Sequence, residues 1–134
     1  MIQLFYVFSD WGIFLLRLVL GLTLVKHGWP KIKNLKGTGE SFSGMGFKPG
    51  VFWSTLVAFL EFFGGLMLVA GFFTQVISLF FVLEFAVIIL FVKRKAGFVG
   101  GYEFDLLIFA VALLLASVGS GALSIDNLLK ILIF

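Results

Sequence analysis

Four long apolar stretches constrain the fold of this chain more than any other feature. They cover residues 11–29, 51–71, 74–92 and 103–119, and each has about the 20 residues that a helix needs to cross the bilayer. Because backbone polar groups in lipid must be satisfied within their own segment, these stretches are predicted to be helices. We therefore expect an all-α fold: a polytopic membrane protein with a bundle of four transmembrane helices.

Composition points the same way. Hydrophobic residues make up 61% of the 134 residues and charged residues 13%, whereas a soluble domain carries about 25% charge. The spans and their connections use almost the whole chain, so one domain, residues 1–134, is expected. Its tail, residues 124–134, is too short to span and is predicted to form an interfacial helix with Ser124 as its N-cap.

Several function classes are excluded. The chain has no cysteine, so it cannot supply a thiolate nucleophile, a disulfide relay or iron–sulfur ligands. It has one histidine, His27, which rules out bis-histidine haem ligation within one protomer, and no metal site is expected. The net charge of +3 comes from basic residues beside the spans, so nucleic acid is not an expected partner.

The basic residues predict the topology. The connections 30–50 and 93–101 hold Lys31, Lys33, Lys36, Lys48, Lys93, Arg94 and Lys95, while Lys130 is alone near the opposite helix ends. Loops rich in Lys and Arg stay in the cytoplasm. We therefore expect a multi-pass protein of the cell (plasma) membrane, with both connections cytoplasmic and both termini outside.

Four charged residues interrupt the apolar stretches: Arg17, Glu61, Glu84 and Asp105. A charge at the bilayer centre costs roughly 2.5–3.5 kcal/mol on insertion scales, so it is paired, faces a cavity or titrates. Counting residues from the span ends places Arg17, Glu61 and Glu84 in one middle layer, which predicts an Arg17–Glu61 ion pair, either direct or bridged by one polar group. Acids outnumber the base there, so at least one acid is expected to be neutral. The pair is either structural or part of a polar cavity or proton relay.

Small residues lie on the same helical stripes as these charges and are expected to bring helices close together. The candidate packing residues are Gly21, Gly28, Gly64 and Gly65. Nearer the cytoplasmic edge, Glu103 and Asp105 occupy the first turn of the fourth span, where the helix dipole favours acids. Asp105 also shares a stripe with small residues, which favours an inward direction.

These residues define a candidate polar cleft. We expect Arg17, His27, Glu61 and Glu103 to converge between the first, second and fourth spans as a stepped hydrogen-bonding path to the bilayer centre. Asp105 and Glu84 are further candidates, and no catalytic residue can be assigned.

The order of the residues resembles the DoxX family of small four-helix membrane proteins, over about residues 13–128. The resemblance is carried by Arg17, Gly21, His27, Gly28, Lys31 or Lys33, Phe42, Gly46, Glu61, Gly64, Gly65, Gly71, Glu103, Gly119, Ser120, Gly121, Ser124, Ile125 and Asp126. It implies a four-helix bundle and favours Glu103 as the acid of the fourth helix. A histidine that is frequent near the end of the third helix in this family is absent, which argues against a two-histidine quinone site.

The resemblance also implies an association with quinone-linked oxidoreduction, because the related DoxD subunit belongs to a membrane thiosulfate:quinone oxidoreductase. The first hypothesis is therefore a quinone-interacting subunit, with quinone as the possible cofactor and a homo-oligomer or a redox subunit as partner in the lipid bilayer. The alternatives are a non-enzymatic scaffold or assembly factor with a structural polar layer, and a small transporter or proton pathway.

Overall fold

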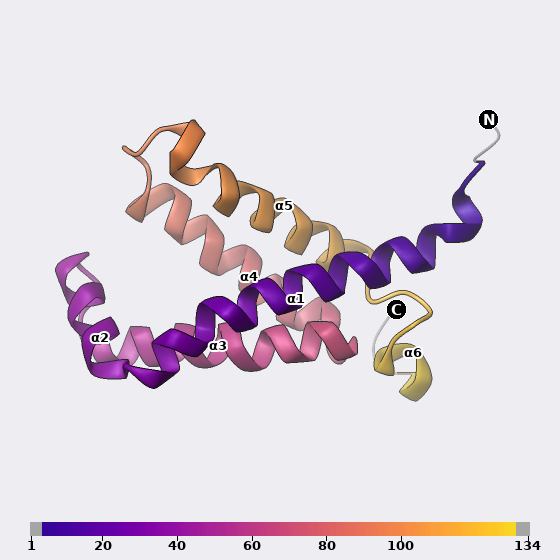
Figure 1. Ribbon diagram of the computed structural model, residues 1–134, viewed down its shortest axis with the longest axis horizontal. Helices are drawn as coiled ribbons and strands as arrows, with labels where there is room; N and C mark the ends of the chain where they lie inside the picture. Colours follow the sequence, from indigo (N-terminus) through magenta and orange to yellow (C-terminus); the bar gives the residue numbers. More distant parts are fainter. Residues whose placement is uncertain (1–3, 131–134) are drawn as a thin grey trace.

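The computed structural model describes residues 4–130, and every regular element in this range is helical (Figure 1). The elements are η1 (Tyr6–Phe8), α1 (Ser9–Lys33), α2 (Leu35–Gly44), α3 (Gly50–Ala70), α4 (Thr74–Val87), η2 (Ile88–Val92), η3 (Phe98–Tyr102), α5 (Glu103–Val118) and α6 (Ile125–Leu129). Four helical segments are long and apolar enough to cross a membrane: Tyr6–Lys33, Gly50–Ala70, Thr74–Val92 and Phe98–Val118. The predicted all-α, four-span fold is confirmed.

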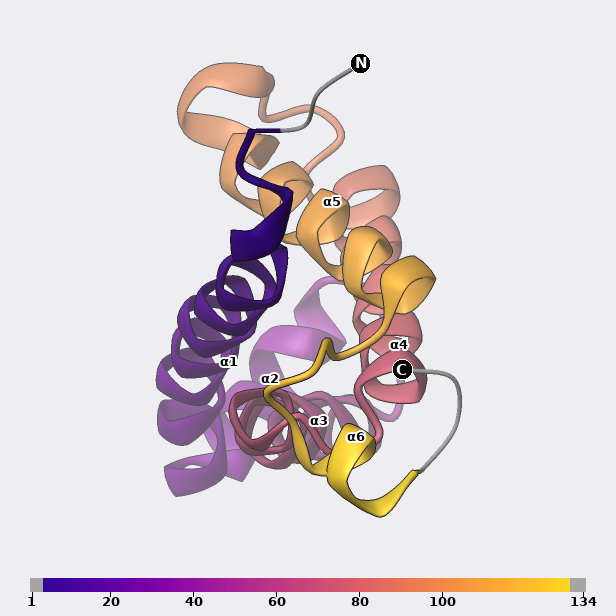
Figure 2. The same ribbon diagram turned by 90° about the vertical axis from the view of Figure 1, so that its right-hand side faces the viewer.

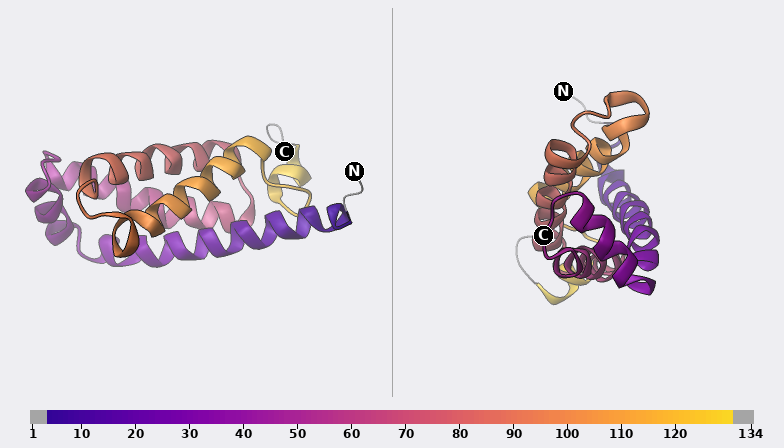
Figure 3. Two further views of the ribbon diagram at one scale, coloured as in Figure 1. Left: turned by 90° about the horizontal axis from the view of Figure 1, so that it is seen from above. Right: turned by 90° about the vertical axis from the view of Figure 1, so that its left-hand side faces the viewer.

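The bundle is built from two helix pairs, α1 with α3 and α4 with α5. Figure 2 views these pairs nearly end-on, and Figure 3 shows that they run along the long axis of the molecule. Helix α2 and the α4–α5 connection lie at one end, whereas the start of α1 and helix α6 lie at the other. The two lysine-rich connections therefore share one end of the bundle.

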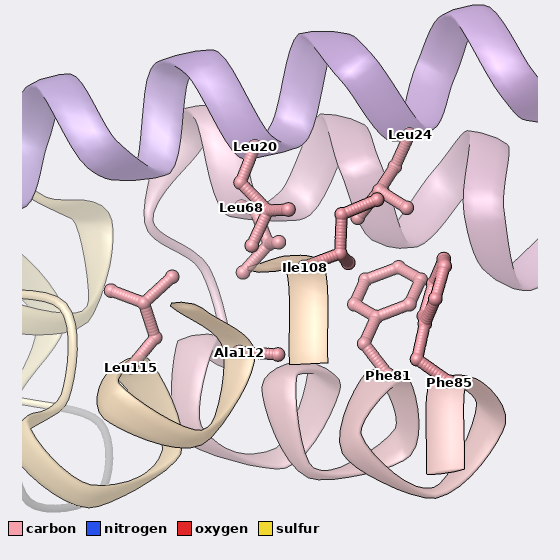
Figure 4. Packing of buried hydrophobic residues seen from close by; sticks show 8 residues of the cluster. All are labelled: Leu20, Leu24, Leu68, Phe81, Phe85, Ile108, Ala112 and Leu115. Carbon is pink, nitrogen blue, oxygen red and sulfur yellow. The ribbon is translucent and has the colours of Figure 1, made fainter. Parts of the chain in front are cut away.

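A small apolar core joins the two pairs at mid-length (Figure 4). It consists of Leu20, Leu24, Leu68, Phe81, Phe85, Ile108, Ala112 and Leu115. Large apolar side chains elsewhere on the spans stay exposed, such as Leu15, Phe63 and Leu107. In water such an apolar surface would promote aggregation, whereas lipid tails solvate it. The fold therefore suits a lipid environment.

Glycines set the contact between α1 and α3. A Cβ atom on Gly21 would lie 2.5 Å from the carbonyl oxygen of Gly65, and a Cβ on Gly65 would lie 2.6 Å from the oxygen of Gly21. Further along, a Cβ on Gly28 would lie 2.6 Å from the amide nitrogen of Phe62. Gly64 faces α4 instead, with Phe81 against it. These contacts fix an antiparallel register in which Gly21 is level with Gly65 and Gly28 with Phe62.

The first long connection differs from the expectation. The sequence predicts that the first helix ends at residue 29, before Pro30, and that residues 30–50 form a loop. Instead, α1 continues through Pro30 to Lys33, and α2 occupies Leu35–Gly44. Pro30 lies in the last turn of α1, where a missing backbone N–H disturbs few later bonds. The side chain of Asn34 then accepts a hydrogen bond from the Gly37 amide and starts α2.

The C-terminal segment is fastened to the turn between α3 and α4. Ser124 caps α6 by accepting from the Asn127 amide, as predicted; residues 131–134 of the expected tail lie outside the described residues. The Asp126 carboxylate accepts from the amides of Phe73 and Thr74, at 2.7 and 2.9 Å. Asp126 therefore caps α4 from a distant part of the chain, where a negative charge also complements the helix dipole.

Candidate functional site

The ion pair at the centre of the candidate site joins α1 to α3. Lys31 Nζ contacts both carboxylate oxygens of Glu61, at 2.8 and 2.7 Å. The Glu61 side chain is 2% exposed and that of Lys31 is 27% exposed. Because α1 continues past Pro30, Lys31 stands four residues after His27 on the same helical face. Helix extension thus supplies the cation that Glu61 needs.

The predicted Arg17–Glu61 ion pair is wrong. The Arg17 guanidinium is buried and donates to the carbonyl oxygens of Leu68, at 3.2 Å, and Leu123. The glycine register explains this, because it places Arg17 level with the C-terminal end of α3. Glu61 lies seven residues before Leu68 on α3, which is about 10 Å along the helix. Arg17 therefore ties the α6 segment to the bundle and does not line the candidate site.

A second ion pair joins the end of η2 to α5. Lys93 Nζ lies 2.7 Å from a carboxylate oxygen of Asp105, and the Asp105 side chain is only 7% exposed. The wide π-turn of Ile88–Val92 precedes Lys93, whose amide donates to the Ile88 carbonyl at 2.9 Å. Such π-turns are frequent at functional sites because they shift side chains away from the regular helical register.

The structure separates the two acids at the start of α5. Asp105 is buried and paired, whereas Glu103 is exposed and accepts from the amide of Gly100 at 3.1 Å. Glu103 is thus a local turn-stabilising residue. The family resemblance favoured Glu103 as the acid of the fourth helix, whereas the stripe of small residues favoured an inward Asp105. The buried position of Asp105 agrees with the second prediction.

Glu84 is placed differently from the other acids. Both of its carboxylate oxygens are buried, and neither has a hydrogen-bond partner in the described part of the chain. The carboxylate of Glu61 is its charged neighbour on α3. Two ionised carboxylates side by side repel one another, so a proton on one of them stabilises the pair.

These groups surround a cavity of about 720 Å³. Six ionisable side chains line it: His27, Lys31, Glu61, Glu84, Lys93 and Asp105. The remaining lining is apolar and comes from Phe42, Met45, Phe47, Trp53, Leu56, Val57, Leu60, Phe80, Leu83, Phe85, Val87, Ile88, Val92, Phe104 and Ile108. Pockets that bind small organic ligands have this composition, a largely apolar wall with a few convergent polar groups.

The cavity lies toward the end of the bundle that carries the lysine-rich connections. Helix α2 and the turn after it contribute Phe42, Met45 and Phe47 to its wall. Leu56 on α3 and Leu83 on α4 also line it, yet they remain 52% and 58% exposed. No other described element covers these two side chains fully, so the wall between α3 and α4 is open to surrounding lipid.

His27 contributes an aromatic ring to the wall. Its ring lies 5.8 Å from that of Phe104, tilted by 31°, and its side chain is exposed. Among residues 4–130, no group of three or more His, Asp or Glu side chains is arranged to hold a metal ion. Each ring nitrogen of His27 is able to donate or accept a hydrogen bond at the cavity wall.

Of the six residues proposed for the polar cleft, the cavity brings together His27, Glu61, Glu84 and Asp105, but not Arg17 or Glu103. Sequence reasoning missed the two lysines. Lys31 could have been found from its i+4 spacing to His27, had the helix been extended past Pro30. No helical spacing could have identified Lys93. Its partner Asp105 lies on the next helix, and the sequence does not reveal the shape of the connection between them.

The fold and the site define a small four-span membrane protein with a largely apolar cavity and two partly buried ion pairs. The sequence profile of the DoxX family matches residues 12–94. The chain therefore belongs to the DoxX family.

Two relatives illustrate the match. The chain is 33% identical to the putative oxidoreductase CatD of Bacillus subtilis over 115 residues, which cover 86% of this chain and 84% of CatD. It is 39% identical to the inner membrane protein YqjF of Escherichia coli over 127 residues, covering 91% of this chain and 95% of YqjF. No solved structure is significantly similar to the chain.

Proposed function

We propose that this protein is a quinone-binding membrane subunit of an oxidoreductase system, with the quinone ring in the cavity between α1, α3, α4 and α5. The cavity carries the proposal. Its volume of about 720 Å³ falls within the range of roughly 300–1,000 Å³ that is usual for small-molecule sites. The name of the relative CatD, a putative oxidoreductase, supports the redox context.

The residues present fit a quinone. Its ring and isoprenoid chain are apolar and suit aromatic walls such as Phe42, Phe104 and Trp53. Its carbonyl oxygens require hydrogen-bond donors, which His27 and Glu84 can supply. The uncovered wall between α3 and α4 gives a lipid-dissolved ligand a lateral route into the site.

Electrons would come from a partner subunit, because a chain without cysteine and with one histidine offers little to hold a redox centre. The quinone would then bind here and exchange electrons with that partner. The lysine-rich end of the bundle is proposed to face the cytoplasm, with both termini outside. In this orientation the partner would dock on the cytoplasmic end, near the cavity.

Tryptophan fluorescence can test the binding step. Trp53 lines the cavity, whereas Trp11 lies at the start of α1 and is 62% exposed. Single-tryptophan variants in nanodiscs would retain either Trp53 or Trp11 and be titrated with decylubiquinone, a quencher. We expect saturable quenching at Trp53 and only gradual, non-saturating quenching at Trp11.

Equal, non-saturating quenching at both tryptophans would mean that the quinone dissolves in the lipid without binding, and would overturn the proposal. His27 can be tested separately in the native complex. The substitution His27→Phe keeps the ring contact with Phe104 but removes the nitrogens, so quinone-dependent turnover should fall while expression holds. Unchanged turnover would remove His27 from the mechanism.

A further inference from the structure

The cavity contains one carboxyl group more than its cations can balance. Lys31 is paired with Glu61, and Lys93 is paired with Asp105, each at 2.7 Å. His27 on α1 completes the ionisable groups that line the cavity, and no contact joins it to an acid in residues 4–130. Glu84 is thus the acid that remains without a cation.

The surroundings of Glu84 disfavour its charge. Both oxygens are excluded from water, and the neighbouring group on α3 is the carboxylate of Glu61. Burial and an adjacent like charge both favour the neutral form of an acid. Lys31 also acts on Glu84 electrostatically, but its ammonium group already contacts both oxygens of Glu61.

We propose that Glu84 is a neutral carboxylic acid whose O–H group is the donor that recognises a carbonyl oxygen of the cavity ligand. The inference rests on the proposed quinone function and deepens it. In the ligand-free protein the Glu84 oxygens have no hydrogen-bond partner among the described residues, and with a ligand present the O–H donates to the ligand carbonyl. Glu84 is therefore a ligand-binding and specificity-determining residue.

This arrangement selects the chemical class of the ligand. A neutral ring that carries carbonyl acceptors satisfies the Glu84 donor and leaves both ion pairs intact. A lipid phosphate or a carboxylate would bring a negative charge beside Glu61 and Asp105, both of which already have their cations. A purely apolar tail would fill the cavity but leave the Glu84 O–H group without an acceptor. The site is thus specific for quinone-like or other carbonyl-bearing apolar molecules.

Infrared spectroscopy tests the protonation without any ligand. The carbonyl stretch of a protonated carboxyl group lies above the amide band and shifts on transfer to D₂O. We expect such a band in the wild-type protein in nanodiscs at pH 7, its loss in Glu84→Gln, and its persistence in the matched variant Glu103→Gln. Absence of the band from the wild type, or its persistence in Glu84→Gln, would overturn the assignment.

Binding of decylubiquinone to the single-Trp53 protein tests the donor role. Glu84→Gln keeps an N–H donor and should bind within about twofold of wild type, whereas Glu84→Leu should bind about five- to tenfold more weakly, the loss expected for one hydrogen bond. Equal affinity of Glu84→Leu and wild type would refute the donor role. If the wild type itself does not bind, the quinone function fails, while the infrared result still decides whether Glu84 carries the proton. If Glu84→Leu does not fold, weak binding by Glu84→Gln would refute the donor role.

Discussion

Replacing Lys31 by methionine should destabilise the bundle more than any other single change at the cavity ion pairs. The substitution keeps the apolar stem and removes the ammonium group, which leaves the Glu61 carboxylate 2% exposed and without its cation. Breaking a fully buried ion pair in this way costs about 3–5 kcal/mol. Lys31 itself is 27% exposed, so some water reaches the pair, and we expect a loss of about 2–3 kcal/mol after that screening.

The reverse substitution should cost less. In Glu61→Leu the remaining Lys31 can bend its flexible stem toward water, so the loss should be about 1 kcal/mol. The double variant Lys31→Met/Glu61→Leu should recover most of the stability lost in Lys31→Met, because no unpaired charge stays buried. Lys36→Met, at an exposed position in the next helix, is the matched control and should change stability by less than about 0.5 kcal/mol.

The assay is reversible unfolding by SDS in mixed micelles at pH 8, followed by far-UV circular dichroism. The wild type, the two single variants and the double variant form a double-mutant cycle, and Lys36→Met is measured beside it. A Lys31→Met protein as stable as Lys36→Met, or a double variant no more stable than Lys31→Met, would refute the reasoning.

Three further predictions concern helix packing, the capping of α4 by Asp126, and topology. Gly65→Ala should lower stability by about 1–3 kcal/mol through overpacking, whereas Gly12→Ala, with nothing within 4 Å of the new Cβ, should not; similar melting temperatures would contradict the close α1–α3 contact. Asp126→Ala should cost about 1–2 kcal/mol and speed amide exchange at the start of α4, and unchanged exchange would remove its capping role. In cysteine-accessibility labelling, cysteine at Ser9 should react from outside and cysteine at Lys36 from the cytoplasm; the opposite pattern would reverse the topology.

The four spans were predictable because bilayer thickness fixes the length of an apolar helix, whatever its neighbours are. The Ser124 cap was predictable for a similarly local reason, since its hydrogen bond to the Asn127 amide needs only the next turn of chain. The inward position of Asp105 could be read from its stripe of small residues. Each of these features depends on residues that are close together in the sequence.

The partners of the charges could not be predicted, because they depend on register between helices. Counting residues from the assumed span ends put Arg17 level with Glu61. The real register comes from backbone contacts such as Gly21 against Gly65, which no periodicity reveals. In addition, α1 ends about one turn later than predicted. Lys31 therefore lies on the helix, where it can reach Glu61, and not in a loop.

The role of Asp126 was beyond the sequence for a related reason. Its acceptor bonds cap a helix that begins 52 residues earlier, at Thr74, and nothing in the local pattern links the two segments. The cavity has the same origin. Its wall combines side chains of α1, α2, α3, α4, η2 and α5, which lie far apart in the sequence and meet only in the folded bundle.

Mass spectrometry of the protein purified with its native lipids can show whether a quinone occupies the cavity. Ligands released from the wild type would be identified and compared with those from Val57→Trp, a substitution that fills the cavity wall. A quinone should be enriched in the wild-type sample above its level in the bulk lipid and should be lost from Val57→Trp. A quinone content no higher than in the bulk lipid, or equal retention by a correctly folded Val57→Trp protein, would contradict the quinone-binding proposal.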